Sequence, residues 1–416
     1  MICEFKVKNY GTFSEEVSVS FYADMRTKRL SSNCLKIGNR HLVKTLGVYG
    51  PNNTGKSSLI MAMFFLQRIM SGDAVNNCFN LFGDNTVTEF EIVYYVNERK
   101  YRYHVNYDSK DCIILSELLE RVRENPSNPF DVSNEHILFR DSKTTSFGEG
   151  TAMPQLMGFV LDRKRAVMSV LNFEKTPIAE AQKDYFEFLK SLFFIDMNHP
   201  INAEKTMRIM QDDQKGKEFI VNFVKNCDLN IEDFGYDKDI RNDVDVIDKI
   251  AEAIQAQQPN SETLKLWSQH FGKTIPSYLI DSVGTRKLVS LSGYIYEALR
   301  DGKTLIVDEL DGSLHHILTR AIVALFNNQL NKKAQLLFTT HDLMLLDLKT
   351  LMRKDQILLT NINKDKKTST ITSLSSFTAQ DGIRGDENIA EYYLKGKFGS
   401  IPTPELFDVL VEVTKK

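Results

Sequence analysis

Residues 50–57, Gly50-Pro51-Asn52-Asn53-Thr54-Gly55-Lys56-Ser57, decide the fold of this chain. The apolar residues 45–49 before them predict a strand, and residues 58–70, rich in Leu, Ile, Met and Phe, predict a helix. This order of strand, glycine-rich loop and helix is typical of a loop that binds nucleotide phosphates. Gly50 and Gly55 would let the backbone turn so that its N–H groups point at phosphate oxygens.

Two side chains of this stretch bring the expected chemistry. Lys56 would supply a positive charge to the β- and γ-phosphates, and the Ser57 hydroxyl would be a ligand of Mg²⁺. The positive end of the following helix would add to the attraction. A surface turn rich in Asn and Gly is the alternative interpretation. The residues expected to contact the nucleotide are Gly50, Asn52, Asn53, Thr54, Gly55, Lys56, Ser57 and Ser58.

A second signal lies far downstream, at residues 305–309 (LIVDE). An apolar run that ends in two adjacent acids is typical of a buried parallel strand. Asp308 would bind Mg²⁺, directly or through water, and Glu309 would polarise the attacking water. Taken alone, the same run is explained equally well by a strand that ends at a solvated acidic turn.

A histidine follows the next predicted strand. Residues 310–315 (LDGSLH) come directly after the acid pair, a helical pattern covers residues 320–330, and a buried strand is predicted at 335–338. His341 at the end of that strand could reach the γ-phosphate and sense whether it is present. A histidine in such a place is more often structural, but its position after a phosphate loop and an acid pair favours the functional role.

Between these features, residues 281–287 (DSVGTRK) precede an apolar helical pattern at 288–299. Ser282, Gly284 and Thr285 at the start of a helix would offer hydroxyls and backbone N–H groups to an anion. The simpler alternative is an N-cap made by Ser282 or Thr285.

The four features together resemble the ABC-type ATPases of the SMC and RecF superfamily. Those proteins have the same order along the chain: a phosphate loop, a signature (here Ser282–Thr285), an acidic strand and a switch histidine (here His341). More narrowly, the chain resembles the compact AAA-labelled ATPases of bacterial anti-phage defence, including relatives of the OLD proteins and the ATPase of the PARIS system. The narrower resemblance rests on residues 4–13 (EFKVKNYGTF), on residues 313–315 (SLH), and on the tail residues 384–386 and 393–402. It covers roughly the first hundred and the last hundred and forty residues.

The resemblance implies a role for each matching residue. Lys56 and Ser57 would bind phosphate and Mg²⁺, and Asp308 would complete the metal site. Glu309 would be the catalytic base. His341 would be the switch that contacts the γ-phosphate. ATP and Mg²⁺ are the cofactors that follow from this assignment.

The resemblance also implies that the site is shared between subunits. Ser282, Gly284 and Thr285 would form a signature that faces the nucleotide of a second head, so a homo-oligomer with at least two heads is expected. The signature lacks the double glycine of transporter-type and SMC-type heads, and His316 stands where many relatives have proline. Gln67 lies inside the helix after the phosphate loop, so it does not fit the glutamine loop of such ATPases.

Composition limits the class of protein. With 416 residues, 42% hydrophobic and 26% charged, the chain has the balance of an ordinary globular protein of two or three domains. It contains no apolar run long enough to cross a membrane and no secretion signal, and its five cysteines are scattered, so we expect a cytoplasmic protein. The net charge of −3 does not indicate a nucleic-acid partner, although DNA binding stays open.

The predicted fold class is α/β: an ABC-type P-loop NTPase head with an antiparallel β lobe and a helical insertion. Residues 1–160 and 275–416 would form the head, and residues 161–274 the insertion. Strands are expected in a hairpin within residues 1–22, in the lobe at 89–96, 101–107, 112–122 and 136–140, and near the end at 356–359 and 369–374. Helices are expected at 179–192, 203–227, 244–258, 261–271 and 387–395.

The leading hypothesis is an oligomeric ATP-hydrolysing switch. By resemblance, it would be the sensor of an anti-phage defence system that controls a separate effector, a toxin or a nuclease. One alternative is a DNA-repair ATPase that clamps DNA between two heads, as RecF-like and SMC-like proteins do. Another is a nucleotide-binding scaffold without hydrolysis, against which the adjacent Asp308 and Glu309 argue.

Overall fold

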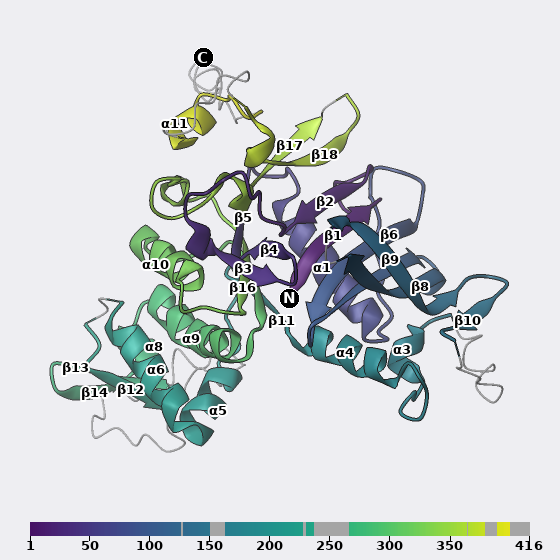
Figure 1. The fold of residues 1–416 in the computed structure, drawn as a ribbon. Coiled ribbons are helices and arrows are strands. Elements are labelled where there is room, and N and C mark those ends of the chain that lie inside the picture. Colours follow the sequence, from purple (N-terminus) through teal and green to yellow (C-terminus); the bar gives the residue numbers. More distant parts are fainter. Residues whose placement is uncertain are drawn as a thin grey trace, which may run out of the picture.

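Six strands form a central sheet, in the order β11-β15-β16-β5-β17-β18 (Figure 1). The computed structural model describes residues 1–125, 128–149, 163–227, 230–236, 266–363, 365–378 and 389–399. All neighbours from β11 to β17 are parallel, and only β18 is antiparallel to its partner. The bounds are β11 (Leu192–Asp196), β15 (Thr304–Asp308), β16 (Gln335–Thr339), β5 (Thr45–Tyr49), β17 (Ile357–Asn363) and β18 (Thr368–Ser373).

Helices cover both faces of this sheet. Within β15, Ile306 belongs to one hydrophobic core, whereas Leu305 and Val307 belong to a second core. The first core contains α1 (Lys56–Met70), and the second contains α9 (Val283–Asp301) and α10 (His316–Asn327). Because both faces are buried, the inner strands are apolar throughout, as the uninterrupted apolar runs in the sequence predicted.

An antiparallel sheet of seven strands forms the lobe beside the first core. Its order is β10-β9-β8-β7-β6-β1-β2. The bounds are β10 (Thr145–Phe147), β9 (Asn128–Arg140), β8 (Ile113–Asn125), β7 (Arg99–Asp108), β6 (Val87–Val96), β1 (Ile2–Lys8) and β2 (Val17–Ser20). The predicted N-terminal hairpin and the predicted lobe are therefore confirmed. A short hairpin of β3 (Cys34–Ile37) and β4 (Arg40–Val43) follows β2 in the chain.

The middle of the chain is more than a helical insertion. The helices α3 (Val167–Val170) and α4 (Ala179–Lys190) contribute to the core of the lobe, where the rings of Phe188 and Tyr94 stack with centroids 4.0 Å apart. Strand β11 follows α4 directly and is an edge strand of the central sheet. The segment expected as an insertion at 161–274 thus supplies parts of both layers of the head, because β11 pairs in parallel with β15.

A smaller unit lies between β11 and α9 in the sequence. It contains α5 (Glu204–Asp212), α6 (Gln214–Lys225), β12 (Asp233–Tyr236), β13 (Leu266–His270), β14 (Lys273–Pro276) and α8 (Ser277–Ile280). Its three strands form a sheet in the order β12-β13-β14, and its apolar core packs against Val289 of α9. Figure 1 shows this unit at one end of the molecule, below α9 and α10.

Three helix predictions differ from the structure. The helix expected at 179–192 ends at Lys190, and β11 begins two residues later. The helix expected at 203–227 is two helices. Asp213 accepts a hydrogen bond from the Gly216 N–H and so caps the start of the second helix, α6. The helix expected at 261–271 is wrong for its described part, which is β13. The helix expected at 244–258 lies outside the described residues.

The C-terminal helix prediction is confirmed where the structure describes it, as α11 (Ile389–Leu394). Short 3₁₀ helices occur at Ser31–Asn33, Leu343–Leu345, Lys354–Gln356 and Leu374–Ser376. All five cysteines are free thiols. In the part of the chain that is described, no helix is both long and apolar enough to cross a membrane.

Candidate active site

The phosphate loop joins β5 to α1, as predicted, and its two glycines are required by close contacts. A Cβ at Gly50 would overlap the Thr360 side chain on β17. Gly55 has φ +102°, and a Cβ there would stand 2.7 Å from the Thr12 hydroxyl oxygen. Any larger residue at either position would push the loop away from the sheet. The loop therefore packs tightly against β17 and against the turn at Thr12.

Lys56 lies inside this loop and is buried. Its Nζ donates to the carbonyl oxygens of Gly50 at 2.9 Å and of Pro51 at 3.0 Å. Burial lowers the pKa of Lys56, and the negative charges of Glu309, Asp308 and Asp311 oppose that shift. The structure therefore brings the lysine and the downstream carboxylates into one electrostatic environment.

Asp308 is the last residue of β15, and Glu309 follows it in a left-handed backbone conformation with φ 53°. One hydroxyl holds both residues. The Thr339 side chain donates to Asp308 Oδ1 and accepts a hydrogen bond of 2.7 Å from the Glu309 backbone N–H. Left-handed backbone is uncommon for glutamate, so this contact fixes a strained turn that sets the direction of the Glu309 side chain.

Strand order explains why these residues meet. In the sheet, β15, β16 and β5 are adjacent and parallel, so their carboxyl ends lie at the same edge. Asp308 ends β15, His341 follows β16, and the phosphate loop follows β5. The order of the strands thus assembles residues that are hundreds of positions apart in the sequence.

His341 lies exposed at this edge. Its backbone N–H is 3.2 Å from Asp311 Oδ2. The pKa of His341 is lowered from its ordinary value, mainly by desolvation of the ring and then by the charge of Lys56, while Asp311, Glu309 and Asp308 oppose the shift. The charges of Lys56 and of these three carboxylates therefore all act on the His341 ring.

The predicted signature lies at the start of α9. Ser282 caps this helix by accepting a 3.0 Å hydrogen bond from the Thr285 N–H. The predicted N-cap at Ser282 is therefore confirmed. A Cβ at Gly284 would overlap the carbonyl oxygen of Ser313. Among the described residues, no hydrogen bond or ion pair joins Ser282, Gly284 or Thr285 to the phosphate loop of the same chain.

The sequence did not single out the loop after β11, yet it borders the site. Asp196, at the end of β11, pairs in register with Asp308, and the Met197 N–H donates to the Asp308 carbonyl oxygen at 3.0 Å. His199 Nδ1 lies 2.6 Å from Asp196 Oδ2. The only local signal was the run Leu192–Asp196, an apolar strand ending in an acid, which resembles β15. Gln67 donates instead to the Leu189 carbonyl oxygen at 2.9 Å, so it ties α1 to α4.

The residues at this edge fit a magnesium nucleotide. The exposed Ser57 hydroxyl and the Asp308 carboxylate are hard oxygen donors of the kind that Mg²⁺ prefers, and phosphate oxygens and water usually complete its shell. No group of three or more His, Cys, Asp or Glu side chains in the described residues could hold a metal ion by itself.

The chain is similar to one family model and to solved structures. Residues 162–347 match the family model described as "AAA domain, putative AbiEii toxin, Type IV TA system", a span that includes α9, the acid pair and His341. The chain is similar to the SMC head domain from Thermotoga maritima, with 12% identity over 89% of this chain and 98% of that one and a TM-score of 0.41.

It is also similar to an SmcHead structure solved bound to the C-winged helix domain of ScpA, with 12% identity over 92% of this chain and 99% of that one and a TM-score of 0.43. No curated protein matches the chain. The strand–loop–helix geometry, the parallel central sheet and the antiparallel lobe together form a mixed α/β P-loop fold.

Proposed function

We propose that this protein is an ATP-binding and ATP-hydrolysing switch that works as a homo-oligomer of heads. One observation supports it most strongly: Lys56, Asp308, Glu309 and His341 meet at one edge of the central sheet. Phosphoryl transfer depends mainly on positioning and on stabilising negative charge, and this edge provides both.

Each residue has a distinct task in this proposal. Lys56 leaves its loop carbonyls and binds the β- and γ-phosphates. Ser57 and Asp308 hold Mg²⁺, which neutralises charge on the phosphates when it is bound. Glu309 accepts a proton from the attacking water, and its fixed backbone turn directs the carboxylate. His341 contacts the γ-phosphate and reports its presence.

The signature supports a site shared between two heads. The start of α9 is open to solvent, with Val283 53% exposed, and among the described residues its signature residues make no hydrogen bond or ion pair with the phosphate loop of the same chain. Two further apolar side chains are exposed shortly after the acid pair and the histidine in the sequence: Ile317, 61% exposed, in the first turn of α10, and Met344, 63% exposed, three residues after His341. A second head would cover these groups and receive the N-terminal N–H groups of α9 at its nucleotide.

The biological setting is a further part of the proposal. The matched family description names a toxin and a toxin–antitoxin system. We infer that this chain is the regulatory ATPase of an anti-phage defence system acting in the cytoplasm, where ATP is held, and that it controls a separate toxin or nuclease. In this setting, ATP-driven joining and separation of heads would restrain or release the effector.

The test compares Glu309→Gln with Lys56→Ala in the full chain. Glu309→Gln should keep ATP binding, lower phosphate release at least about a hundredfold, and accumulate ATP-bound dimers. Lys56→Ala should lose ATP binding and dimer formation together. Near-normal phosphate release by Glu309→Gln would show that Glu309 is not the catalytic base. If Glu309→Gln stayed monomeric at saturating ATP, the site would not be shared between two heads.

The same samples address DNA clamping. An ATPase that clamps DNA should bind duplex DNA only with ATP, with an affinity that falls steeply as salt rises. ATP-dependent DNA binding by Glu309→Gln would favour the clamp over the control of a separate effector.

A further inference from the structure

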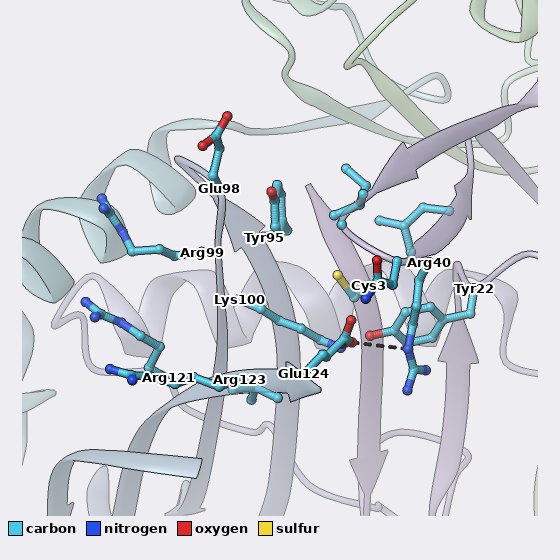
Figure 2. A pocket seen from close by; sticks show the side chains of 15 residues that line it. Cys3, Tyr22, Arg40, Tyr95, Glu98, Arg99, Lys100, Arg121, Arg123 and Glu124 are labelled. Carbon is cyan, nitrogen blue, oxygen red and sulfur yellow. Dashed lines mark hydrogen bonds and ion pairs between the residues drawn. The ribbon is translucent and has the colours of Figure 1, made fainter. Parts of the chain in front are cut away.

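Buried polar atoms of proteins normally have hydrogen-bond partners, because an unpaired one has lost its contacts with water. The cavity in Figure 2 shows the usual case: Glu124 Oε1 lies 2.6 Å from Lys100 Nζ and 3.1 Å from Arg40 Nε. Two atoms at the candidate active site differ from this rule. The Tyr49 hydroxyl and Asp342 Oδ2 are both buried, and neither has a hydrogen-bond partner among the described residues.

The backbone brings these two residues together. Tyr49 is the last residue of β5. On the adjacent strand β16, Thr339 is the register partner of Val48, so the next residue, Thr340, lies beside Tyr49. The Asp342 N–H donates to Thr340 Oγ1 at 2.9 Å, which holds Asp342 next to Thr340 and therefore near Tyr49.

The charge of Asp342 acts on the Tyr49 hydroxyl. Tyr49 is 1% exposed, and burial raises the pKa of its hydroxyl well above the ordinary value. Among the neighbouring groups that raise this pKa further, Asp342 has the largest effect, followed by Asp311 and then Tyr393. The hydroxyl thus lies within the electrostatic reach of the Asp342 carboxylate, although no hydrogen bond joins them.

Each of the two residues is attached to a part of the candidate site. Tyr49 directly precedes the phosphate loop, and Asp342 directly follows His341. The other oxygen of this carboxylate, Oδ1, accepts a 2.9 Å hydrogen bond from the Met344 N–H and so caps the 3₁₀ helix Leu343–Leu345. Met344 on this helix is an exposed apolar side chain. A movement of Asp342 would therefore be passed to the surface of the head.

We propose that Tyr49 is a positioning residue for the switch at His341. When His341 contacts the γ-phosphate, the loop after β16 closes the gap to β5, and the Tyr49 hydroxyl donates a hydrogen bond to Asp342 Oδ2. This bond holds the loop in its ATP-bound position and reorients the 3₁₀ helix that carries Met344. Without a γ-phosphate, the two atoms stay apart. The inference rests on the proposed function, because it requires a γ-phosphate at His341.

The unpaired atoms explain why such a bond would favour one state. An unpaired buried hydroxyl destabilises the folded protein, and a hydrogen bond to a carboxylate is stronger than a bond between neutral groups. The pair is therefore unfavourable in the free head and favourable in the ATP-bound head. A difference of this kind between two states is what allows a ligand to shift a conformational equilibrium.

The test is Tyr49→Phe in the full chain, which removes only the hydroxyl group. The probes are ADP and a non-hydrolysable ATP analogue, with affinities measured by calorimetry. We expect affinity for the ATP analogue to fall roughly tenfold or more, as for the loss of a charge-assisted hydrogen bond, and affinity for ADP to stay unchanged. Without nucleotide, the melting temperature should stay the same or rise, because the lost hydroxyl had no partner.

Tyr94→Phe is the matched control. The Tyr94 hydroxyl is also buried and unpartnered among the described residues, but its ring stacks on Phe188 in the core of the antiparallel lobe. This substitution should change neither affinity.

Asp342→Ser tests the partner of the proposed bond. Serine can still cap the 3₁₀ helix, but its short side chain does not reach Tyr49. Affinity for the ATP analogue should fall as in Tyr49→Phe. Adding Tyr49→Phe to Asp342→Ser should then have no further effect, because the two substitutions remove the same bond.

The unmodified protein separates this inference from the proposed function. If it did not bind the ATP analogue, both would be wrong. If it bound the analogue and folded Tyr49→Phe bound it equally well, only the inference would be wrong. Equal loss of ADP and analogue affinity, or additive effects of Tyr49→Phe and Asp342→Ser, would also overturn the inference. So would a lower melting temperature of Tyr49→Phe without nucleotide, which would show that a buried water already pairs the hydroxyl.

Discussion

The backbone of Gly284 lies directly against the carbonyl group of Ser313, so closely that a Cβ at position 284 would overlap this oxygen. Gly284 is in the first turn of α9, and Ser313 lies in the loop after the acid pair with φ 69°. One turn further along α9, Lys287 donates to the Met197 carbonyl oxygen and lies 3.5 Å from Ser313 Oγ. The start of α9 and the loops after β15 and β11 therefore form one packed unit beside the candidate site.

This contact predicts that Gly284→Ala impairs hydrolysis without impairing ATP binding. The added methyl group must displace either the first turn of α9 or the Ser313 loop, at a cost of about 1–3 kcal/mol in the free energy of unfolding. Because Lys56 is on another element, ATP affinity of the single head should not change. Phosphate release should fall roughly tenfold or more, since small misplacements at a catalytic site are costly.

Gly83→Ala is the matched control for this experiment. A Cβ at Gly83 would have only Asn80 Oδ1 within 4 Å, at 3.8 Å, so both stability and turnover should stay near those of the unmodified protein. Normal phosphate release by a folded Gly284→Ala variant would show that the α9–Ser313 contact does not position the site.

Thr339→Val should weaken the acid pair. The substitution keeps the shape of the side chain but removes the hydroxyl that donates to Asp308 and accepts from the Glu309 N–H. A buried N–H without a partner costs about 1–3 kcal/mol, and the Glu309 turn loses its anchor. We expect a lower melting temperature and phosphate release reduced roughly tenfold or more.

Thr319→Val is the internal control for Thr339→Val. The Thr319 side chain is also fully buried, but its hydroxyl has no hydrogen-bond partner among the described residues. Removing this hydroxyl should leave turnover unchanged and should not lower the melting temperature. Equal effects of the two substitutions would mean that the Thr339 hydroxyl has no special role.

The sequence predicted the site where its signals are local. The phosphate loop is eight consecutive residues, and Asp308, Glu309 and His341 each follow a short apolar run that is visible without a structure. The hydrogen bonds of Thr339 were not predictable in this way. They depend on the register between β15 and β16, in which Val307 lies opposite Phe338, and no local pattern encodes this register.

The wrong predictions have the same origin. Strand β11 is five residues long and directly follows α4, so helical periodicity continued into it in the sequence. Strand β13 was predicted as a helix, yet its residues alternate between buried and half-buried because Trp267 and its neighbours pair with both β12 and β14. In both cases tertiary pairing decides the conformation of a short segment whose local preference is ambiguous.

Asp281→Asn should displace the signature residues, because Asp281 ties the start of α9 to the small sheet. Asp281 is 3% exposed and directly precedes the N-cap Ser282. Its carboxylate accepts hydrogen bonds from the hydroxyls of Ser268, at 2.7 Å, and Ser277, and its Oδ1 lies 3.1 Å from His270 Nε2. Losing the charge should cost about 1.5–3 kcal/mol in stability and should lower turnover more than ATP affinity, because α9 loses its tie to the small sheet.

Asp301→Asn, at the other end of the same helix, is the control for Asp281→Asn. Asp301 pairs with Arg300 at the surface, and such pairs contribute only about 0–1 kcal/mol. Urea denaturation and phosphate release should therefore be near normal for Asp301→Asn. If Asp281→Asn gave the same mild result, the small sheet would not position the signature.

The lowered pKa of His341 predicts a dependence on pH that changes sign when ATP binds. Without nucleotide, the pKa of His341 in the folded protein lies below its ordinary value of about 6.5. As the pH falls through this range, the unfolded chain takes up its proton first, so the unfolding free energy should decrease. His341→Gln should remove this part of the decrease, measured as the difference between the two proteins in urea titrations from about pH 7.5 to about pH 5.5.

Bound ATP should reverse this effect, because a γ-phosphate near His341 stabilises the protonated ring. In the Glu309→Gln background, where ATP is retained, ATP affinity should therefore rise as the pH falls from about 7.5 to about 6, relative to the same protein with His341→Gln. Calorimetry in buffers of different ionisation enthalpy should detect proton uptake on ATP binding that His341→Gln abolishes. Equal proton uptake with and without the histidine would exclude a contact between His341 and the γ-phosphate.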